Sequence, residues 1–132
     1  METARDKLPM LVGDSRRLKQ VLINLVKNAL KFTASGCIQI MTCYDAHSKS
    51  LVVHVKDSGV GIDSEDIPIL FQKFGKLHRT VKMNSDGVGL GLTIVKQVVE
   101  ASKGHVEVQS AGVGHGSCFI FSMQIEKSDN IQ

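Results

Sequence analysis

Apolar residues between positions 15 and 32 recur every three or four residues, which is the period of an amphipathic helix. Asp14 or Ser15 can cap this helix, because a short polar side chain there accepts a backbone N–H of the first turn. Three polar residues fall together on one shoulder of the apolar face. The apolar face holds Leu18, Val21, Leu22, Leu25, Ala29 and Phe32, and the polar row holds Asn24, Asn28 and Lys31.

Short apolar segments bounded by polar or glycine-rich stretches predict strands. The polar stretch 45–50 joins two of them, which favours an antiparallel hairpin, and the glycine-rich turn 112–116 joins the last two. The strands that we expect are residues 8–12 (a short strand or an extended lead-in), 37–44, 51–56, 105–108 and 117–125.

Two further helices are expected. A short one covers residues 64–74, with Pro68 in or near its first turn, and a longer one covers residues 89–102, with Leu92, Val95, Val98 and Val99 facing inward. Residues 75–86 have no clear period and predict a flexible loop. Because helices and strands alternate irregularly, we expect an α+β fold, a two-layer α/β sandwich whose mixed sheet is covered on one face by helices.

Length and composition limit the classes of protein to which the chain can belong. At 132 residues the chain suits a single domain, for which we expect an ordered core over residues 8–126, cut from a longer chain. A net charge of +3, a single Tyr and no Trp give little support to nucleic-acid binding, because little aromatic surface is available for stacking on bases. Three cysteines without a CxxC pair disfavour a zinc site and fit a reducing, cytoplasmic compartment. No run of 18 apolar residues is present, so we expect no membrane span.

Two polar features suggest a ligand site. Asp57 follows an apolar strand and begins the sequence Asp-Ser-Gly-Val-Gly, where a carboxylate can accept from an exocyclic amine while glycines admit a flat ring. An ordinary turn is the alternative. Asn24 and Asn28, four residues apart, can offer amide oxygens to Mg²⁺, although both could instead be solvent-facing helix residues.

A second glycine run, residues 86–91, comes directly before the last expected helix, where free N–H groups favour phosphate. Its spacing is not that of the dinucleotide-binding fingerprint, and no Gly-Lys-Ser/Thr of a P-loop occurs. A flexible hinge explains this run equally well. Each of the five histidines lacks a partner at metal-ligand spacing, so we interpret them as structural or surface residues.

Taken together and in this order, these segments resemble the catalytic and ATP-binding domain of sensor histidine kinases, within the GHKL ATPase superfamily. The resemblance covers nearly the whole chain, and the combination is far more specific than any one segment. It rests on an N box at residues 17–33, a G1 box at 57–62, an F box at 70–74, a G2 box at 87–92 and a final glycine box at 114–119.

The resemblance implies a role for each matching position. Asp57 should bind the adenine amine, Asn28 should ligate Mg²⁺, and residues 75–86 should act as a flexible ATP lid. Lys76 stands where many relatives carry Arg, so it keeps the charge and loses the planar fork. The implied catalytic residues are Asn24, Lys31 and Lys76; the implied nucleotide-binding residues are Asn24, Asn28, Lys31, Asp57, Gly59, Gly61, Ile62, Phe74, Gly87, Gly89, Leu90, Gly91, Leu92 and Ser117.

The implied reaction is transfer of the γ-phosphoryl group of MgATP to a histidine on a separate dimerisation domain, with a response regulator receiver domain as the indirect partner. No histidine here is followed by Glu or Asp, so we expect a monomeric domain that binds ATP without phosphorylating itself. We expect no nucleic acid and no direct membrane contact. The alternatives are a non-catalytic nucleotide-binding module and a GHKL-type ATPase; the latter is disfavoured because Asn24 stands where those enzymes use a Glu base.

Overall fold

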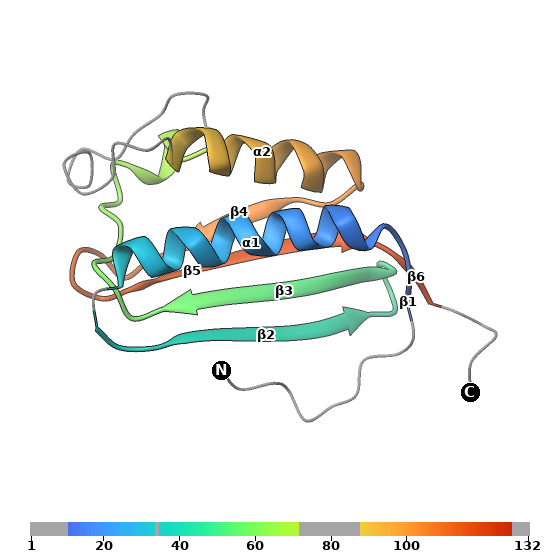
Figure 1. Ribbon diagram of the computed structural model, residues 1–132, viewed down its shortest axis with the longest axis horizontal. Helices are drawn as coiled ribbons and strands as arrows, with labels where there is room; N and C mark the ends of the chain where they lie inside the picture. Colours follow the sequence, from blue (N-terminus) through green and yellow to red (C-terminus); the bar gives the residue numbers. More distant parts are fainter. Residues whose placement is uncertain (1–10, 34, 72–87, 128–132) are drawn as a thin grey trace.

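The computed structural model describes residues 11–33, 35–71 and 88–127. Two helices lie side by side on one face of a four-stranded sheet (Figure 1). The elements in chain order are β1 (Leu11–Val12), α1 (Ser15–Phe32), β2 (Ile38–Asp45), β3 (Ser50–Asp57), a 3₁₀ turn η1 (Ile67–Ile69), α2 (Val88–Ala101), β4 (Val106–Gln109), β5 (Ser117–Gln124) and β6 (Glu126–Lys127).

The sheet has the strand order β2-β3-β5-β4, and each neighbouring pair is antiparallel. The expected two-layer α+β sandwich is therefore confirmed, but the expectation of a mixed sheet is wrong. β3 and β4 run in the same direction, as the connection through α2 requires, yet β5 lies between them (Figure 1). No parallel pair forms among the described strands for that reason.

The first helix begins and ends where the apolar period predicts. The carboxylate of Asp14 accepts the backbone N–H of Arg16 at 2.9 Å, which caps α1. Val21, Leu25 and Ala29 are buried on the face toward the sheet. Burial of this stripe, rather than helix propensity alone, stabilises the helix.

The core lies between the helices and the sheet. Alternate residues of β3 and β5 point into it, and α2 adds a second apolar stripe. Phe71 packs edge-on against Phe119 with ring centroids 6.2 Å apart and adds a partly buried ring to the core. The inward set is Leu51, Val53, Val55, Phe119, Phe121 and Met123 from the sheet, with Leu92, Val95 and Val99 from α2.

The expected helix over residues 64–74 is not formed in its described part, which contains turns and the three-residue η1. Local hydrogen bonds explain the difference. Asp63 accepts from the backbone N–H of Glu65 through its side chain at 3.1 Å and from that of Asp66 through its carbonyl at 2.9 Å. Such side-chain-to-backbone bonds compete with helical pairing.

β1 and β6 form a separate antiparallel pair near the β2–β3 hairpin. Just before β6, the backbone N–H of Ile125 donates to the Lys49 carbonyl at 3.0 Å, and its carbonyl accepts from the Tyr44 hydroxyl at 3.2 Å. These bonds attach the last described strand to the hairpin. None of the helices in the described residues combines the length and apolarity that crossing a bilayer requires.

Candidate functional site

The segments singled out in the sequence meet at one end of the molecule. β3 ends at Asp57, β5 begins at Ser117, α1 ends at Phe32, and α2 begins at Val88, all on the left of Figure 1. The backbone N–H of Val60 donates to the Phe32 carbonyl at 3.0 Å, which ties the segment after β3 to the end of α1. The candidate N, G1, G2 and final glycine boxes therefore share one end of the fold.

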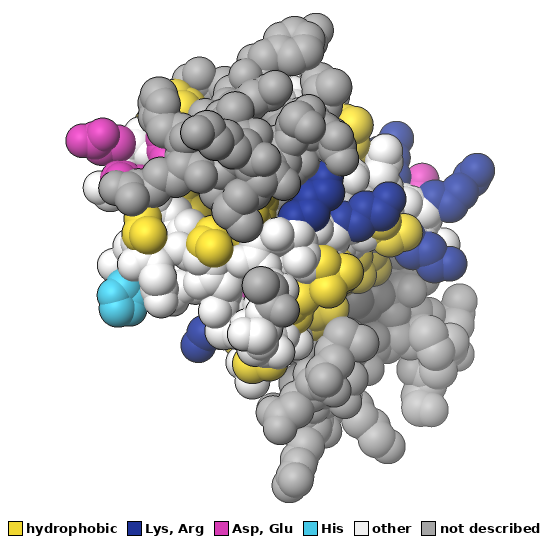
Figure 2. Space-filling model, turned by 60° about the vertical axis from the view of Figure 1, so that its left-hand side comes forward, with side chains coloured by type: hydrophobic (Ala, Val, Ile, Leu, Met, Phe, Trp, Pro, Cys, Tyr) yellow, Lys and Arg dark blue, Asp and Glu magenta, His cyan; other side chains and the backbone are white. Residues whose placement is uncertain are grey.

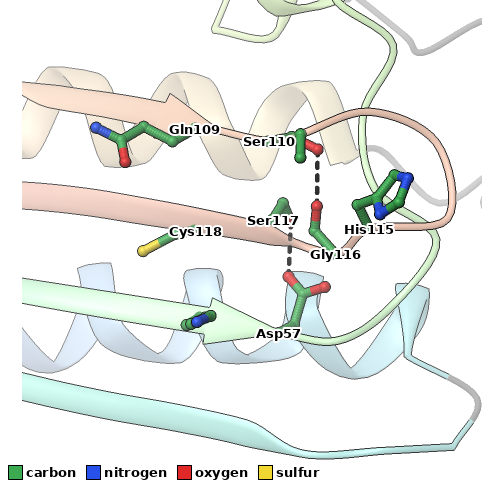
Figure 3. A pocket seen from close by; sticks show the side chains of 9 residues that line it. Asp57, Gln109, Ser110, His115, Gly116, Ser117 and Cys118 are labelled. Carbon is green, nitrogen blue, oxygen red and sulfur yellow. Dashed lines mark hydrogen bonds between the residues drawn. The ribbon is translucent and has the colours of Figure 1, made fainter.

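Asp57 is a buried acid at this end, with only 4% of its surface exposed. Its Oδ1 accepts the backbone N–H of Gly59 at 2.9 Å, and its Oδ2 accepts the hydroxyl of Ser117 at 2.7 Å (Figure 3). Two bonds from fixed donors orient the carboxylate. Because a carboxylate has about four acceptor positions, capacity remains for a ligand donor.

Glycine is required twice in the segment that follows. A Cβ on Gly59 would overlap the carbonyl oxygen of Phe32 and would lie 2.7 Å from the Thr33 hydroxyl. Gly61 has φ +73° and its Cβ would overlap the Gly112 carbonyl oxygen. The next residue, Ile62, is buried in the core. The backbone after Asp57 is therefore pressed against α1 on one side and the β4–β5 turn on the other.

Sequence reasoning missed Ser110, which follows β4. Its hydroxyl donates to the Gly116 carbonyl at 2.7 Å and accepts the backbone N–H groups of Ile62 at 3.1 Å and Gly112 at 3.2 Å. The available signal was weak: a serine two residues before a turn glycine forms an ST turn with that N–H. Nothing in that local pattern indicates the bond to Ile62, 48 residues away along the chain.

The two asparagines of α1 lie toward this end. Asn28 is 9% exposed, and its Oδ1 is fully buried with no hydrogen-bond donor among the described residues. Asn28 lies one turn before Phe32, about 6 Å along the helix axis. Asn24, one turn earlier, is half-buried, and its Oδ1 lies 3.8 Å from where a Cβ on Gly91 would be. The polar shoulder of α1 therefore faces the first turn of α2.

An orphaned, buried amide oxygen needs an explanation, since leaving such an atom unpaired costs about 1–3 kcal/mol. Amide oxygens are ligands for Mg²⁺, which keeps several waters and binds phosphate oxygens in addition. No group of three or more His, Cys, Asp or Glu side chains capable of holding a metal occurs in the parts of the chain described. The buried amide oxygen of Asn28 is of the chemical type that can hold Mg²⁺.

Of the remaining predicted residues, some lie in the described part of the chain and others lie outside it. Gly89, Leu90, Gly91 and Leu92 lie in the first turns of α2, and Leu92 is buried in the core. Lys31 is exposed in the last turn of α1. The helix start expected beside the G2 box is confirmed, one residue earlier than predicted. Phe74, Lys76, Gly87 and the expected lid over residues 75–86 lie outside the described residues.

Basic side chains gather on one side of this end of the molecule. Figure 2 brings this end forward and shows several Lys and Arg side chains gathered together. α1 contributes to it because Lys27 and Lys31 are exposed near its end, while the helix has no acidic residue. A positive field at this end favours an anionic ligand.

A hollow of about 230 Å³ opens behind Asp57, between the ends of β3, β4 and β5 (Figure 3). Its walls include Lys56, Gln109 and Cys118, which lie opposite one another on the sheet face away from the helices. It is smaller than an ordinary ligand pocket of roughly 300–1,000 Å³ and lies outside the space between sheet and helices. Burial raises the pKa of the Cys118 thiol, and the negative charges of Asp57 and Glu107 add to that effect while Lys56 opposes it.

Comparison with known families agrees with this geometry. Residues 13–127 match the family described as histidine kinase-, DNA gyrase B-, and HSP90-like ATPase. The autoinducer 2 sensor kinase/phosphatase LuxQ of Vibrio parahaemolyticus is 38% identical over 89% of this chain. The sensor histidine kinase GacS of Pseudomonas protegens is 38% identical over 94% of it. The chain spans 14% of the length of each of these relatives.

Solved structures give the same result. Full-length ShkA, crystallised in complex with AMPPNP, superposes with a TM-score of 0.77 at 29% identity, covering 91% of this chain and 24% of that protein. The catalytic domain of histidine kinase ThkA superposes with a TM-score of 0.67 at 32% identity, covering 85% of this chain and 68% of that one. The described fold, the matched family model and these relatives together identify the chain as a member of the histidine kinase-, DNA gyrase B-, and HSP90-like ATPase family, in its sensor histidine kinase branch.

Proposed function

We propose that this chain binds MgATP and transfers the γ-phosphoryl group to a histidine on a separate dimerisation domain. The observation that carries the proposal is the buried Oδ1 of Asn28, which has no hydrogen-bond partner among the described residues and lies on the helix that abuts the segment after Asp57. A metal-binding amide and an adenine-binding acid at one end of the fold match the two ends of MgATP.

Adenine recognition falls to Asp57 in this proposal. The exocyclic amine of adenine is a donor, and the carboxylate is an acceptor-only group held in place by Ser117 and Gly59. The absence of side chains on Gly59 and Gly61 lets the backbone lie flat against neighbouring segments. Fixed acceptors select a ligand more strongly than mobile ones because less ordering is required on binding.

In this proposal residues of α1 and α2 position the phosphates. Asn28 Oδ1 would be a ligand of Mg²⁺, and Asn24 lies one turn away beside Gly91. When bound, Mg²⁺ supplies positive charge that stabilises the charge developing on the transferred phosphoryl group. Lys31 adds a side-chain cation in the last turn of α1, and the first turn of α2 offers backbone N–H groups. The chain's part in catalysis is therefore positioning and charge neutralisation.

Two other functions use the same site. A hydrolytic ATPase needs a general base for water, and the amide of Asn24 cannot accept a proton as a carboxylate does. A non-catalytic nucleotide-binding module needs only the groups that bind the nucleotide. Its site would therefore look like that of a kinase, and only an activity assay separates the two. The receiving histidine, the dimerisation domain and a response regulator belong to the proposal as partners.

The proposal is tested in two stages. Calorimetry should detect ATP binding that Mg²⁺ strengthens, and Asn28→Ala should weaken binding of MgATP by at least tenfold more than binding of metal-free ATP. Gln20→Ala, at an exposed position of the same helix, is the matched control and should change neither affinity. Equal losses for both forms of ATP would remove Asn28 from the metal shell.

In the second stage the chain is mixed with radiolabelled MgATP and the histidine-bearing dimerisation domain of a close relative. Acid-labile phosphate should appear on that domain and not on this chain alone. Replacing the acceptor histidine should abolish the signal. Binding of ATP with steady release of inorganic phosphate and no labelled acceptor would favour the ATPase alternative, and binding with neither product would favour the non-catalytic module.

A further inference from the structure

We propose that Ser110 is a positioning residue that sets the selectivity of the site for adenine, an inference that rests on the proposed function. Ser110 lies outside every segment of the family resemblance, and its hydroxyl bonds go to other residues than Asp57. Its effect on adenine would be transmitted through the segments on both sides of that acid.

The hydroxyl of Ser110 is fully used. A serine hydroxyl has one donor and two acceptor positions. It donates to the Gly116 carbonyl at 2.7 Å, and it accepts the backbone N–H groups of Ile62 and Gly112 at 3.1 Å and 3.2 Å. One side chain therefore joins the end of the G1 box to both ends of the β4–β5 turn.

These bonds reach Asp57 by two short routes. Gly116 directly precedes Ser117, whose hydroxyl holds Asp57 Oδ2 at 2.7 Å. The backbone N–H of Gly116 also donates to the Gly59 carbonyl at 3.1 Å, and the Gly59 N–H holds Asp57 Oδ1 at 2.9 Å. Both donors that orient the carboxylate are thus in segments that Ser110 fixes relative to each other.

Loss of the hydroxyl should leave the fold intact. Ser110 is half-buried and lines two hollows, of about 230 and 240 Å³. Hollows of this size admit water, which can pair with the freed N–H groups of Ile62 and Gly112. Water does not hold the two segments in a single relative position, so the carboxylate would lose orientation rather than the domain losing its structure.

The experiment compares ATP with inosine triphosphate, which has the same phosphates and lacks the exocyclic amine. Calorimetry on Ser110→Ala should show ATP affinity reduced about two- to thirteenfold, the range expected for one lost hydrogen bond. Affinity for inosine triphosphate should change less than twofold. Ser110→Thr, which keeps the hydroxyl, should restore the wild-type ratio. The matched control is Ser50→Ala, because the Ser50 hydroxyl donates to the Ser48 carbonyl at 3.2 Å at the far end of β3.

Each result decides the inference. An equal loss for both nucleotides, or a ratio that Thr fails to restore, would make Ser110 a structural residue only and overturn the proposal. Wild-type protein that does not distinguish the two nucleotides would overturn the adenine role of Asp57 and, with it, this inference. Discrimination that Asp57→Asn abolishes and Ser110→Ala leaves unchanged would overturn this inference alone.

Discussion

Replacing Asp57 by Asn changes the hydrogen bonding of the site without changing the size of the side chain. The native carboxylate accepts from Gly59 on one oxygen and from Ser117 on the other. In the variant, one of these positions becomes an NH₂ donor. If the remaining oxygen keeps the Gly59 N–H, the NH₂ group faces both the Ser117 hydroxyl and the amine of the ligand.

The size of the effect follows from these contacts. The Ser117 hydroxyl can rotate and accept from the new NH₂ group, so the protein loses little by itself. The ligand amine cannot adapt in this way, because it is a donor and the NH₂ group opposite it is also a donor. A hydrogen bond to a charged group contributes about 1.5–3 kcal/mol. We therefore expect ATP to bind about 10- to 150-fold more weakly to Asp57→Asn, at about 1.4 kcal/mol for each factor of ten.

Isothermal titration calorimetry measures this loss, and thermal unfolding of the free variant checks that the fold is retained. Asp45→Asn is a matched control, since Asp45 Oδ1 accepts the backbone N–H of His47 at 3.0 Å in the same i, i+2 geometry at the opposite end of the sheet. The control should bind ATP as the native chain does. ATP affinity within twofold of the native value in Asp57→Asn would refute the assignment of Asp57 to adenine.

Two further outcomes are expected. Gly59→Ala should lower the free energy of unfolding by about 1–3 kcal/mol in urea titration, because the new Cβ would overlap the Phe32 carbonyl oxygen, which already accepts the backbone N–H of Val60. Unchanged stability would mean that this contact is loose. Iodoacetamide should modify exposed Cys43 faster than Cys118 near pH 8, as followed by mass spectrometry of the peptides, because burial raises the pKa of Cys118 and lowers its thiolate fraction. Faster labelling of Cys118 would contradict this effect of burial.

Local patterns predicted most of the elements. The apolar period located α1 closely, and Asp14 was one of its two candidate caps, because both features depend only on neighbouring positions. The hairpin of β2 and β3 followed from two apolar runs and a polar turn. The helix expected over residues 64–74 was wrong in its described part because the hydrogen bonds of Asp63 outweigh helical period over so short a segment.

The pairing of strands that are far apart in the sequence was harder to predict from local patterns. A chain that passes from β3 through α2 to β4 is compatible with a parallel pair, and only the insertion of β5 between these strands makes the sheet antiparallel. The site shows the same limit. Asp57 and Asn28 belong to segments with recognisable spacing, whereas Ser110 acts through a bond to Ile62 that no local pattern indicates.

The pairing of β1 with β6 sets where the described chain begins and ends in the fold. Leu11 lies opposite Lys127, so the two ends of the described chain leave from neighbouring points. That shared exit is beside the β2–β3 hairpin, a full strand of eight residues, or about 23 Å, from Asp57. Any segment joined to either end would therefore start on the side of the domain opposite Asp57.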